Sequence, residues 1–465
     1  MSKATVQNDF SKGKVWKHIL NIAIPMTIAQ LVQVLYNMVD RIYIGHLPGA
    51  SSLALTGLGL TFPVITLISA FTSLFGGGGA PLCSIARGNH DEARAERIMG
   101  TTLTMLCATS LVLMAISYGF LKPILYLFGA SDASYPYARA YLLIYLIGTP
   151  FIMVGVGMNG FINAQGFARY GMMTISLGAL LNIALDPLFI YVFHLGVSGA
   201  AIATVLSQLA SVVWVMKFLT GRKTLLRIRR RYLKLDFRLL REITALGFST
   251  FIFGLTSGLV QIACNTMLRN FGGDVYVGIM TVLNSIRDFF TLPSGGITSG
   301  AQPVLGYNYG AKQYDRVKQG IRFTTQVSFC YMAAVWLIAL LLPGALIRLF
   351  NDDPAMLAAG IPALRLYFSG FFMMTFHATG QAVFVALGQS KQATFFSLLR
   401  KVIIVVPLTL LLPHLPFFGV NGVFIAEPVS NVVSGIACYI TMLATTRRLL
   451  PSTGSDGQSA SVTRT

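Results

Sequence analysis

The sequence predicts an all-α membrane protein with twelve transmembrane helices in two pseudo-symmetric six-helix bundles around a central cleft. The chain of 465 residues is 54% hydrophobic and only 11% charged, with a mean hydropathy of +0.68, which is far more apolar than a soluble protein of this length. A dozen stretches reach the roughly 20 apolar residues that a helix needs to span a bilayer. The second half of the chain also repeats the first.

The twelve expected helices are separated by short polar or basic connections. None of these stretches alternates between polar and apolar residues, as the strands of a membrane β-barrel would. The expected spans are residues 17–44, 53–85, 97–121, 140–168, 170–193, 198–219, 242–268, 275–305, 320–345, 361–389, 394–415 and 420–446.

An internal repeat divides these spans into two sets. A constant shift of 222 residues aligns "GGAPLCSIARGNHDEAR" (78–94) with "GAQPVLGYNYGAKQYDR" (300–316), pairing Gly78/Gly300, Pro81/Pro303, Gly88/Gly310 and Arg94/Arg316. With one residue more, "GVSGAAIATVLSQ" (196–208) aligns with "GVNGVFIAEPVSN" (419–431). Each copy has an even number of crossings, so both copies enter the membrane from the same side and are expected to be related by an axis along the membrane normal, as in parallel-repeat transporters.

The repeat sets the expected domain boundaries. These are a cytoplasmic N-terminal tail (1–14), a first bundle (15–220), a basic cytoplasmic linker (221–241), a second bundle (242–448) and a disordered cytoplasmic tail (449–465).

The net charge of +19 is interpreted from the positions of the basic residues along the chain. Most Lys and Arg residues fall in the N-terminal tail and in every second connection, with the densest run at residues 217–241; Lys391, Arg400 and Lys401 are assigned to these connections. By the positive-inside rule both termini are cytoplasmic. The basic run is interpreted as an orientation signal lying on anionic lipid, and nucleic-acid binding is not expected.

Other motifs are weak or absent. The sequence contains no G-x-x-x-x-G-K-[ST], H-E-x-x-H or G-x-S-x-G pattern, which argues against direct use of ATP and against these enzyme classes. The "GGGG" at 76–79 and the "GGITSG" at 295–300 are expected to be sites of close helix packing. The five cysteines lack metal-site spacing and are interpreted as packing residues.

Only four of the 16 acidic residues are assigned to the interior of expected spans: Asp40, Asp186, Asp288 and Glu427. An ionised side chain at the bilayer centre is costly, so these four are candidates for function. Only two basic residues, Arg41 and Arg287, are assigned to the interior of spans, and this balance favours a cationic cargo.

Asp186 has the strongest case. Asn182 precedes it by four residues, so both point from one face of the fifth helix. Pro187 follows directly, which frees the carbonyl of Ile183 and bends the helix beside the carboxylate. Together these groups make an oxygen-rich site for a proton, a sodium ion or an ammonium-type cargo. The alternative is a structural pair with a basic side chain, and this helix has none before Lys217.

Asp40 belongs to a polar stripe along the first helix with Gln33, Tyr36 and Asn37, after a bend expected at Pro25. Such a stripe indicates a helix face that lines a water-filled space. The alternative is that Asp40 lies near the membrane interface and pairs with Arg41. Two carboxylates in one low-dielectric cavity disfavour each other's ionisation, so at least one is expected to take up a proton. Asn159 and Asn163 of the fourth span are also assigned to the cargo cavity.

Two acids of the second half are less clear. Glu427 precedes Pro428, a second expected bend that frees the carbonyl of Phe424, and the repeat aligns Glu427 with Thr204. Glu427 is assigned to the cargo cavity, with a structural ion pair as an equal alternative. Asp288 follows Arg287 directly, and these two are interpreted as a charge-compensated pair.

The motifs "MVDRIYIG", "GGGGAPLCSIARGNHDEA", "NIALDP" and "GVSGAAIATVLSQ" together resemble the MATE family, the multidrug and toxic compound extrusion transporters. The resemblance covers about residues 15–448 and implies a bacterial inner-membrane antiporter that expels organic cations in exchange for protons or sodium ions. It places the ion site on Asp40, Asn182, Asp186 and Thr204, and the first-helix bend on Pro25. A monomer without cofactor or ATPase subunit is expected.

Two other classes remain open. A flippase for lipid-linked sugars would share the many-helix architecture, but its anionic cargo would favour a basic cavity. An intramembrane enzyme could use Asp40 and Asp186 as a catalytic pair, although the two-lobed repeat favours transport.

Overall fold

The computed structural model describes residues 9–45, 51–350 and 353–451. Over these ranges the chain is helical and contains no strand. The expected tails lie largely outside them, because residues 1–8 and 452–465 are not described.

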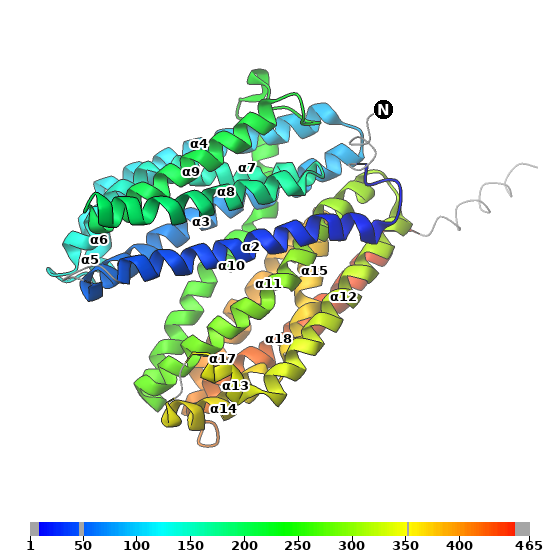
Figure 1. The fold of residues 1–465 in the computed structure, drawn as a ribbon. Coiled ribbons are helices and arrows are strands. Elements are labelled where there is room, and N and C mark those ends of the chain that lie inside the picture. The colour runs from blue at the N-terminus through cyan, green and yellow to red at the C-terminus, as the bar shows by residue number, and fades with distance from the viewer. Residues whose placement is uncertain (1–8, 46–50, 351–352, 452–465) are drawn as a thin grey trace, which may run out of the picture.

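The first half contributes six helical crossings (Figure 1). A short helix, α5 (Leu121–Leu127), precedes the fourth crossing. The crossings are α2 (Val15–Gly45), α3 (Ser51–Gly88), α4 (Glu92–Gly119), α6 (Tyr135–Ile147) with α7 (Thr149–Ala164), α8 (Ala168–Pro187) with a π-helical turn at Leu188–Val192, and α9 (Gly196–Thr220).

A linker containing one 3₁₀ turn, Arg230–Tyr232, leads to the six crossings of the second half. A short helix, α13 (Pro343–Arg348), lies between two of them. The crossings are α10 (Phe237–Gly272), α11 (Asp274–Gly310), α12 (Tyr314–Leu341), α14 (Pro354–Phe368) with the 3₁₀ turn Phe371–Met373 and α15 (Met374–Ala386), α16 (Ser390–Leu398) with the π-helical segment Leu399–Val405, α17 (Val406–Leu411) and the 3₁₀ turn Leu412–His414, and α18 (Asn421–Leu449).

These crossings confirm the twelve-helix prediction. Among the described residues, ten helices are long and apolar enough to span a membrane, and the pair α6 and α7, bent by 55° at its junction, makes an eleventh. The remaining crossing, α11, carries Arg287 and Asp288 in its middle.

Local sequence explains where several helices begin. Asp91 caps α4 by accepting a hydrogen bond from the backbone N–H of Arg94, and Asp236 caps α10 by accepting from Arg238 and Leu239. Asp353 caps α14, and Pro354 occupies the first helical position, where its missing N–H costs nothing.

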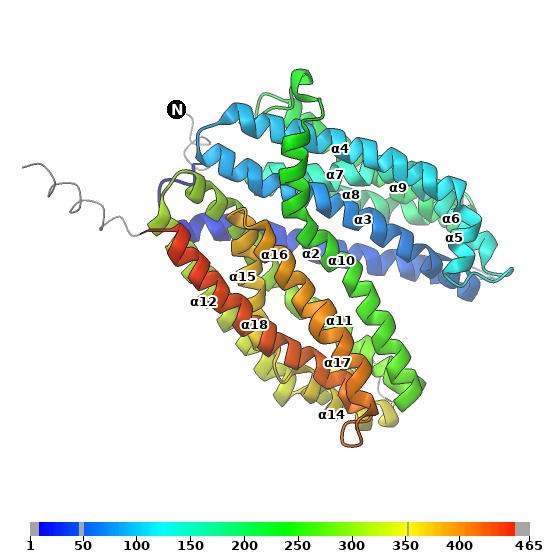
Figure 2. The same cartoon turned by 180° about the vertical axis from the view of Figure 1, so that it is seen from behind.

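The two halves form two bundles that converge at one end of the molecule and diverge at the other (Figures 1 and 2). Between the bundles, α10 packs along α3, and α11 packs along α2. Each bundle has its own apolar core. A third apolar cluster combines α2 with helices of the second half at the end where the bundles meet. We call this end the closed end.

Small residues set how closely the bundles approach. A Cβ atom at Gly78 of α3 would overlap the carbonyl oxygen of Ile243 on α10, and one at Gly300 of α11 would lie 2.7 Å from the backbone nitrogen of Ala23 on α2. Both glycines belong to the runs that the sequence analysis assigned to close packing, so that prediction is confirmed.

The N-terminal segment, residues 9–14, joins the two bundles at the closed end. The Phe10 ring is buried, with the Arg87 guanidinium of α3 5.2 Å from its centroid and the Tyr307 ring of α11 packed edge-on against it at 5.6 Å. Arg316 of α12 donates hydrogen bonds to the carbonyls of Phe10 at 2.8 Å and Gly13 at 2.7 Å. The segment therefore contacts both halves of the chain.

Candidate functional site

The predicted ion site lies inside the first bundle. Asn182 and Asp186 occupy successive turns of α8, and both side chains are buried, with 1% and 0% exposure. Helical spacing places them on one face, as the sequence analysis expected.

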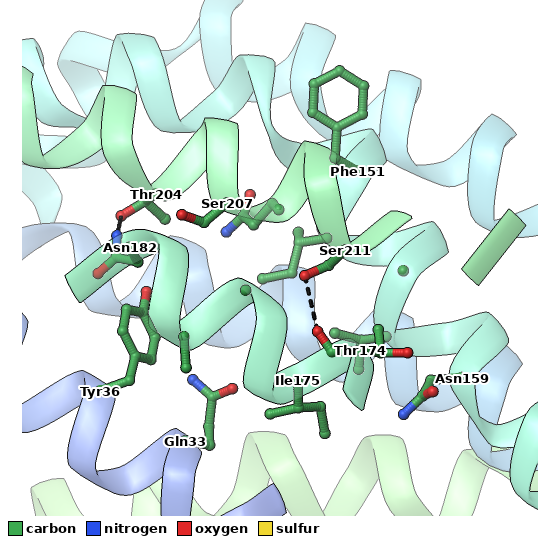
Figure 3. A pocket seen from close by; sticks show the side chains of 16 residues that line it. Gln33, Tyr36, Phe151, Asn159, Thr174, Ile175, Asn182, Thr204, Ser207 and Ser211 are labelled. Atoms are coloured by element: carbon green, nitrogen blue, oxygen red, sulfur yellow. Dashed lines mark hydrogen bonds between the residues drawn. The ribbon is translucent and has the colours of Figure 1, made fainter. Parts of the chain in front are cut away.

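Asn182 links this face to α9. When its amide is oriented to satisfy both of its groups, the nitrogen donates to Asp186 Oδ2 at 2.8 Å, and the oxygen accepts from the hydroxyl and the backbone N–H of Thr204, each at 3.3 Å. Figure 3 shows the contact between Asn182 and Thr204. The carboxyl, the amide and the hydroxyl therefore form one hydrogen-bonded chain.

The helix α2 brings Asp40 and Tyr36 to the same region. Asp40 is buried, and its carboxylate lies close enough to interact electrostatically with that of Asp186. The hydroxyl of Tyr36 points toward Asn182 and Thr204 (Figure 3). Of the polar stripe on this helix, Gln33 and Asn37 are exposed and bonded to each other at 3.3 Å.

A cavity of about 130 Å³ opens beside this cluster (Figure 3). Five residues that the sequence analysis assigned to the ion site or the cargo cavity line it: Gln33, Tyr36, Asn159, Asn182 and Thr204. Ser207, Gln208 and Ser211 of α9 add further polar groups. Asp40, Asp186 and Asn37 are not among the lining residues. The cavity is smaller than typical small-molecule pockets, which begin at about 300 Å³.

A second cavity, of about 300 Å³, lies between the bundles and is lined by residues of α2, α3, α7, α10 and α11. Asn159 and Asn163 of α7 line it from the first bundle, and Thr250 and Gln302 line it from the second. The side-chain oxygens of both asparagines are buried and have no hydrogen-bond partner among the described residues. Both residues therefore line a cavity between the bundles, and their role in binding cargo stays a prediction.

Glu427 lies elsewhere than predicted. Its carboxylate is buried inside the second bundle and accepts hydrogen bonds from Arg400 at 2.9 Å and Lys401 at 3.4 Å. It lines a separate cavity with Arg287 and Tyr367 and not the cavity between the bundles. Its assignment to the cargo cavity was therefore wrong, and the alternative of a structural ion pair is the one observed.

The predicted excess of acidic over basic residues inside the membrane spans also needs correction. Arg400 and Lys401, assigned to a connection on the basic side, are buried in the π-helical segment Leu399–Val405. The buried acids therefore do not outnumber the bases in the second bundle, and only the first bundle keeps the acidic character that favours a cation.

The pairing of Asp288 with Arg287 is confirmed. Two guanidinium nitrogens of Arg287 donate to Asp288 Oδ1 at 3.1 and 2.9 Å, and a third donates to the Tyr367 hydroxyl at 2.8 Å. Tyr367 in turn donates to Asn284 at 3.3 Å. This polar network was not predicted from the sequence. The repeat offered a signal, because it aligns Tyr367 with Tyr145, which is buried beside the first-bundle site.

The three predicted bends differ in the structure. The α-helix of α8 ends at Pro187 and continues as the π-helical turn Leu188–Val192, beside Asp186. Helices α2 and α18 continue through Pro25 and Pro428 without a break. Bends at these two positions remain predictions.

The described residues offer no second candidate site based on a metal ion or on cysteine chemistry. Among the described residues, no group of three or more His, Cys, Asp or Glu side chains is arranged to hold a metal ion. Cys83, Cys264 and Cys438 are buried as packing residues, whereas Cys107 and Cys330 are exposed.

Comparisons with known proteins agree with this architecture. A family model described as MatE matches residues 25–188 and 250–411, one stretch in each bundle. The multidrug export protein MepA of Staphylococcus haemolyticus (strain JCSC1435) is 23% identical, and the match covers 95% of this chain and 96% of that protein.

Two solved structures share the fold. A MATE protein in the bent conformation superposes with a TM-score of 0.90 at 24% identity, covering 97% of this chain and 98% of that one. The outward-facing conformation of a multidrug resistance MATE family transporter of the MOP superfamily gives a TM-score of 0.89 at 24% identity, covering 97% and 99%. At these identities the likeness shows the shared fold.

Proposed function

Because the chain belongs to the MATE family of transporters, we propose that it is a secondary antiporter that exports organic cations in exchange for protons or sodium ions. The observation that carries this proposal is the pair of buried acids, Asp40 and Asp186, beside a polar cavity in the first bundle. The name of the staphylococcal relative, a multidrug export protein, supports the direction and the breadth of the transport.

The chemistry of the site supports a mobile cation. A carboxylate buried in a membrane protein is costly unless a positive charge or a proton compensates it. The Asn182 amide and the Thr204 hydroxyl add polar groups, and the hydrogen bond from Asn182 to Asp186 holds the carboxyl facing them. This group of side chains suits the binding of a proton, which needs only the carboxylates, or of a sodium ion, which needs several oxygen ligands.

The cargo is proposed to bind next to the ion site. Asn159 lines both the 130 Å³ cavity and the 300 Å³ cavity between the bundles. Its unpaired oxygen and that of Asn163 accept hydrogen bonds, which suits the N–H donors of an organic cation. The acidic site in the first bundle does not favour the anionic cargo of a flippase for lipid-linked sugars.

Transport requires that the two ligands compete. With the site open to the outside, an ion enters the Asp40 and Asp186 pair and weakens the attraction for a cationic cargo, which leaves. With the site open to the cytoplasm, the ion departs and cargo binds. Each ligand shifts the equilibrium between the two conformations only by the difference in its affinity for them.

The closed end is proposed to face the cytoplasm of a bacterial inner membrane. The linker and the N-terminal segment lie at this end (Figures 1 and 2), and both are rich in Lys and Arg, as cytoplasmic connections are. The structure would then represent an outward-facing state. A monomer is sufficient for this mechanism, because both bundles belong to one chain.

The test replaces Asp186 with Asn in protein reconstituted into vesicles. Efflux of an organic cation such as ethidium, driven by an imposed ion gradient, is expected to fall to the level of empty vesicles. The matched control, Asp132→Asn, changes an exposed acid whose carboxylate bonds Tyr126, and it should transport normally. Full efflux by the Asp186 variant would refute the assignment. Proton and sodium gradients imposed separately identify the coupling ion.

A further inference from the structure

The second bundle contains more buried positive charge than negative charge. Arg400, Lys401 and Glu427 are buried together, with 2%, 6% and 6% exposure. The positive charge of Arg287 in the same bundle is compensated by Asp288, with which it forms a salt bridge. One cation of the buried group of three is therefore not compensated by an acid.

The geometry identifies Lys401 as that cation. Arg400 lies 2.9 Å from Glu427 and donates from the same nitrogen to Asn431 at 2.9 Å, so it satisfies the carboxylate well. The ammonium group of Lys401 reaches Glu427 only at 3.4 Å and makes no other hydrogen bond among the described residues. An ammonium group has three N–H donors. A buried charge without a partner is strongly unfavourable, so a compensating ligand is expected.

A cavity lies at this position. It measures about 50 Å³ and is lined by Lys401, Arg287, Gln261, Asn284 and Thr409, and also by Glu427, whose carboxylate is bonded to Arg400. The Thr409 hydroxyl is fully buried and has no hydrogen-bond partner among the described residues. A single water needs about 10–15 Å³ by the same kind of measure, so the cavity has room for one small ion with a few waters and not for an organic molecule.

We propose that this cavity binds one monovalent inorganic anion of the size of chloride. The anion would accept hydrogen bonds from the Lys401 ammonium and the Thr409 hydroxyl, and it would neutralise the excess positive charge of the bundle. Arg287, which also lines the cavity, adds to the favourable potential.

The internal repeat gives this site a counterpart. At the shift of 222 residues, Lys401 aligns with Ala179 and Tyr367 with Tyr145; at the shift of 223, Glu427 aligns with Thr204. Ala179 and Thr204 line the first-bundle cavity. Equivalent positions in the two bundles therefore bind opposite charges: a cation beside Asp186 and an anion beside Lys401.

The test compares the full-length protein in sodium chloride and in sodium gluconate at equal ionic strength, because gluconate is too large for the cavity. The unfolding temperature of the wild type is expected to rise with chloride and to saturate. In Lys401→Gln the dependence on chloride should be lost, and this variant should be at least as stable as the wild type in gluconate, because the excess charge is gone. Sodium is constant, so ion binding at Asp186 does not contribute.

Two further variants separate binding from folding. Lys391→Gln removes an exposed lysine from the same segment of chain and should keep the full response to chloride. Thr409→Val should require several times more chloride for half of the effect. In crystals soaked with bromide, an anomalous peak is expected beside Lys401. The absence of any chloride response in the wild type, a response that persists in Lys401→Gln, or bromide bound only elsewhere would overturn the proposal.

Discussion

Asn182 fixes the orientation of the Asp186 carboxyl, which it joins to the polar cluster of the first bundle. Its amide bonds the carboxylate on one side and the Thr204 hydroxyl on the other, so the three side chains hold each other in one orientation. Asp186 and Asn182 were identified from the sequence pattern, because a buried acid one helical turn from an amide is uncommon in an apolar span. Thr204 was assigned through the resemblance to the MATE family.

Removing one member of this chain should weaken ion binding without abolishing it. A neutral hydrogen bond contributes about 0.5–1.5 kcal/mol, so Thr204→Val should raise the ion concentration for half-maximal transport by about 2- to 10-fold. Thr204→Ser, which keeps the hydroxyl, should restore the wild-type value. An unchanged ion dependence in the valine variant would show that Thr204 does not take part.

Glu427 offers a prediction about stability. Glu427→Gln leaves Arg400 and Lys401 buried without an acid, and breaking a buried ion pair by removing one partner costs about 3–5 kcal/mol. In chloride-free buffer the purified variant should unfold at a clearly lower temperature than the wild type. Adding Lys401→Gln to this variant should recover part of the loss, because it removes one of the unpaired cations. Wild-type stability in the single variant would contradict the ion pair.

The sequence left a structural ion pair of Glu427 open but did not identify its partners, for a physical reason. Arg400 and Lys401 follow a basic connection by only a few residues, and a hydropathy pattern cannot distinguish a lysine at the membrane surface from one turned into a bundle. The repeat aligned these positions with Gly178 and Ala179, which line a cavity in the first bundle. That alignment was the available indication that both side chains point inward.

At the scale of the helices, α3 and α11 cross at the closed end through two glycines. A Cβ atom at Gly88 would overlap the carbonyl oxygen of Tyr307, and one at Gly310 would overlap the carbonyl oxygen of Ile85. Any larger residue must therefore push the two helices apart.

A leucine at either glycine should prevent the closed end from forming. Gly88→Leu and Gly310→Leu are each expected to transport poorly. Spin labels on the two bundles at their divergent end should report shorter distances than in the wild type, because the bundles rock toward the opposite conformation. Gly59→Leu is the matched control, since no atom lies within 4 Å of a Cβ at that position of α3. Unchanged distances in both variants would rule out this crossing as a gate.

Sequence patterns located the helices well but missed their irregularities. Most of the expected spans begin and end within a few residues of the observed helices, because a long apolar run has few alternatives to a membrane helix. The fourth span, expected as one helix over 140–168, instead bends by 55° between α6 and α7. Gly148 and Pro150 lie at that junction and could have indicated the bend. The π-helical turn Leu188–Val192 follows Pro187, where a bend was expected, whereas no comparable signal precedes the segment Leu399–Val405.

For the whole molecule, the N-terminal segment contributes to the choice between conformations. Arg316 holds it to α12 through the carbonyls of Phe10, Lys12 and Gly13, and Phe10 packs against Arg87 and Tyr307. These contacts join the two halves only when the bundles meet at this end, so they favour this conformation.

Arg316→Ala should therefore shift the conformational equilibrium away from the closed end. Hydrogen bonds that involve a charged group contribute about 1.5–3 kcal/mol, so the loss of one corresponds to a shift of roughly 10- to 100-fold. Hydrogen exchange of residues 9–14 should accelerate accordingly. Arg322→Ala removes an exposed arginine from the same helix and should leave the exchange unchanged. Equal protection in both variants would exclude the N-terminal segment as a clamp.

The crossing of α3 and α11 has a meaning for the origin of the chain. Gly88 approaches Tyr307 and Ala311, and Gly310 approaches Ile85 and Asn89. The internal shift of 222 residues converts each of these two sets of contacts into the other. A self-complementary contact of this kind is what a homodimer forms across its two-fold axis. An ancestral protein of half this length, paired with an identical copy, would already have possessed this junction before gene duplication and fusion joined the two copies.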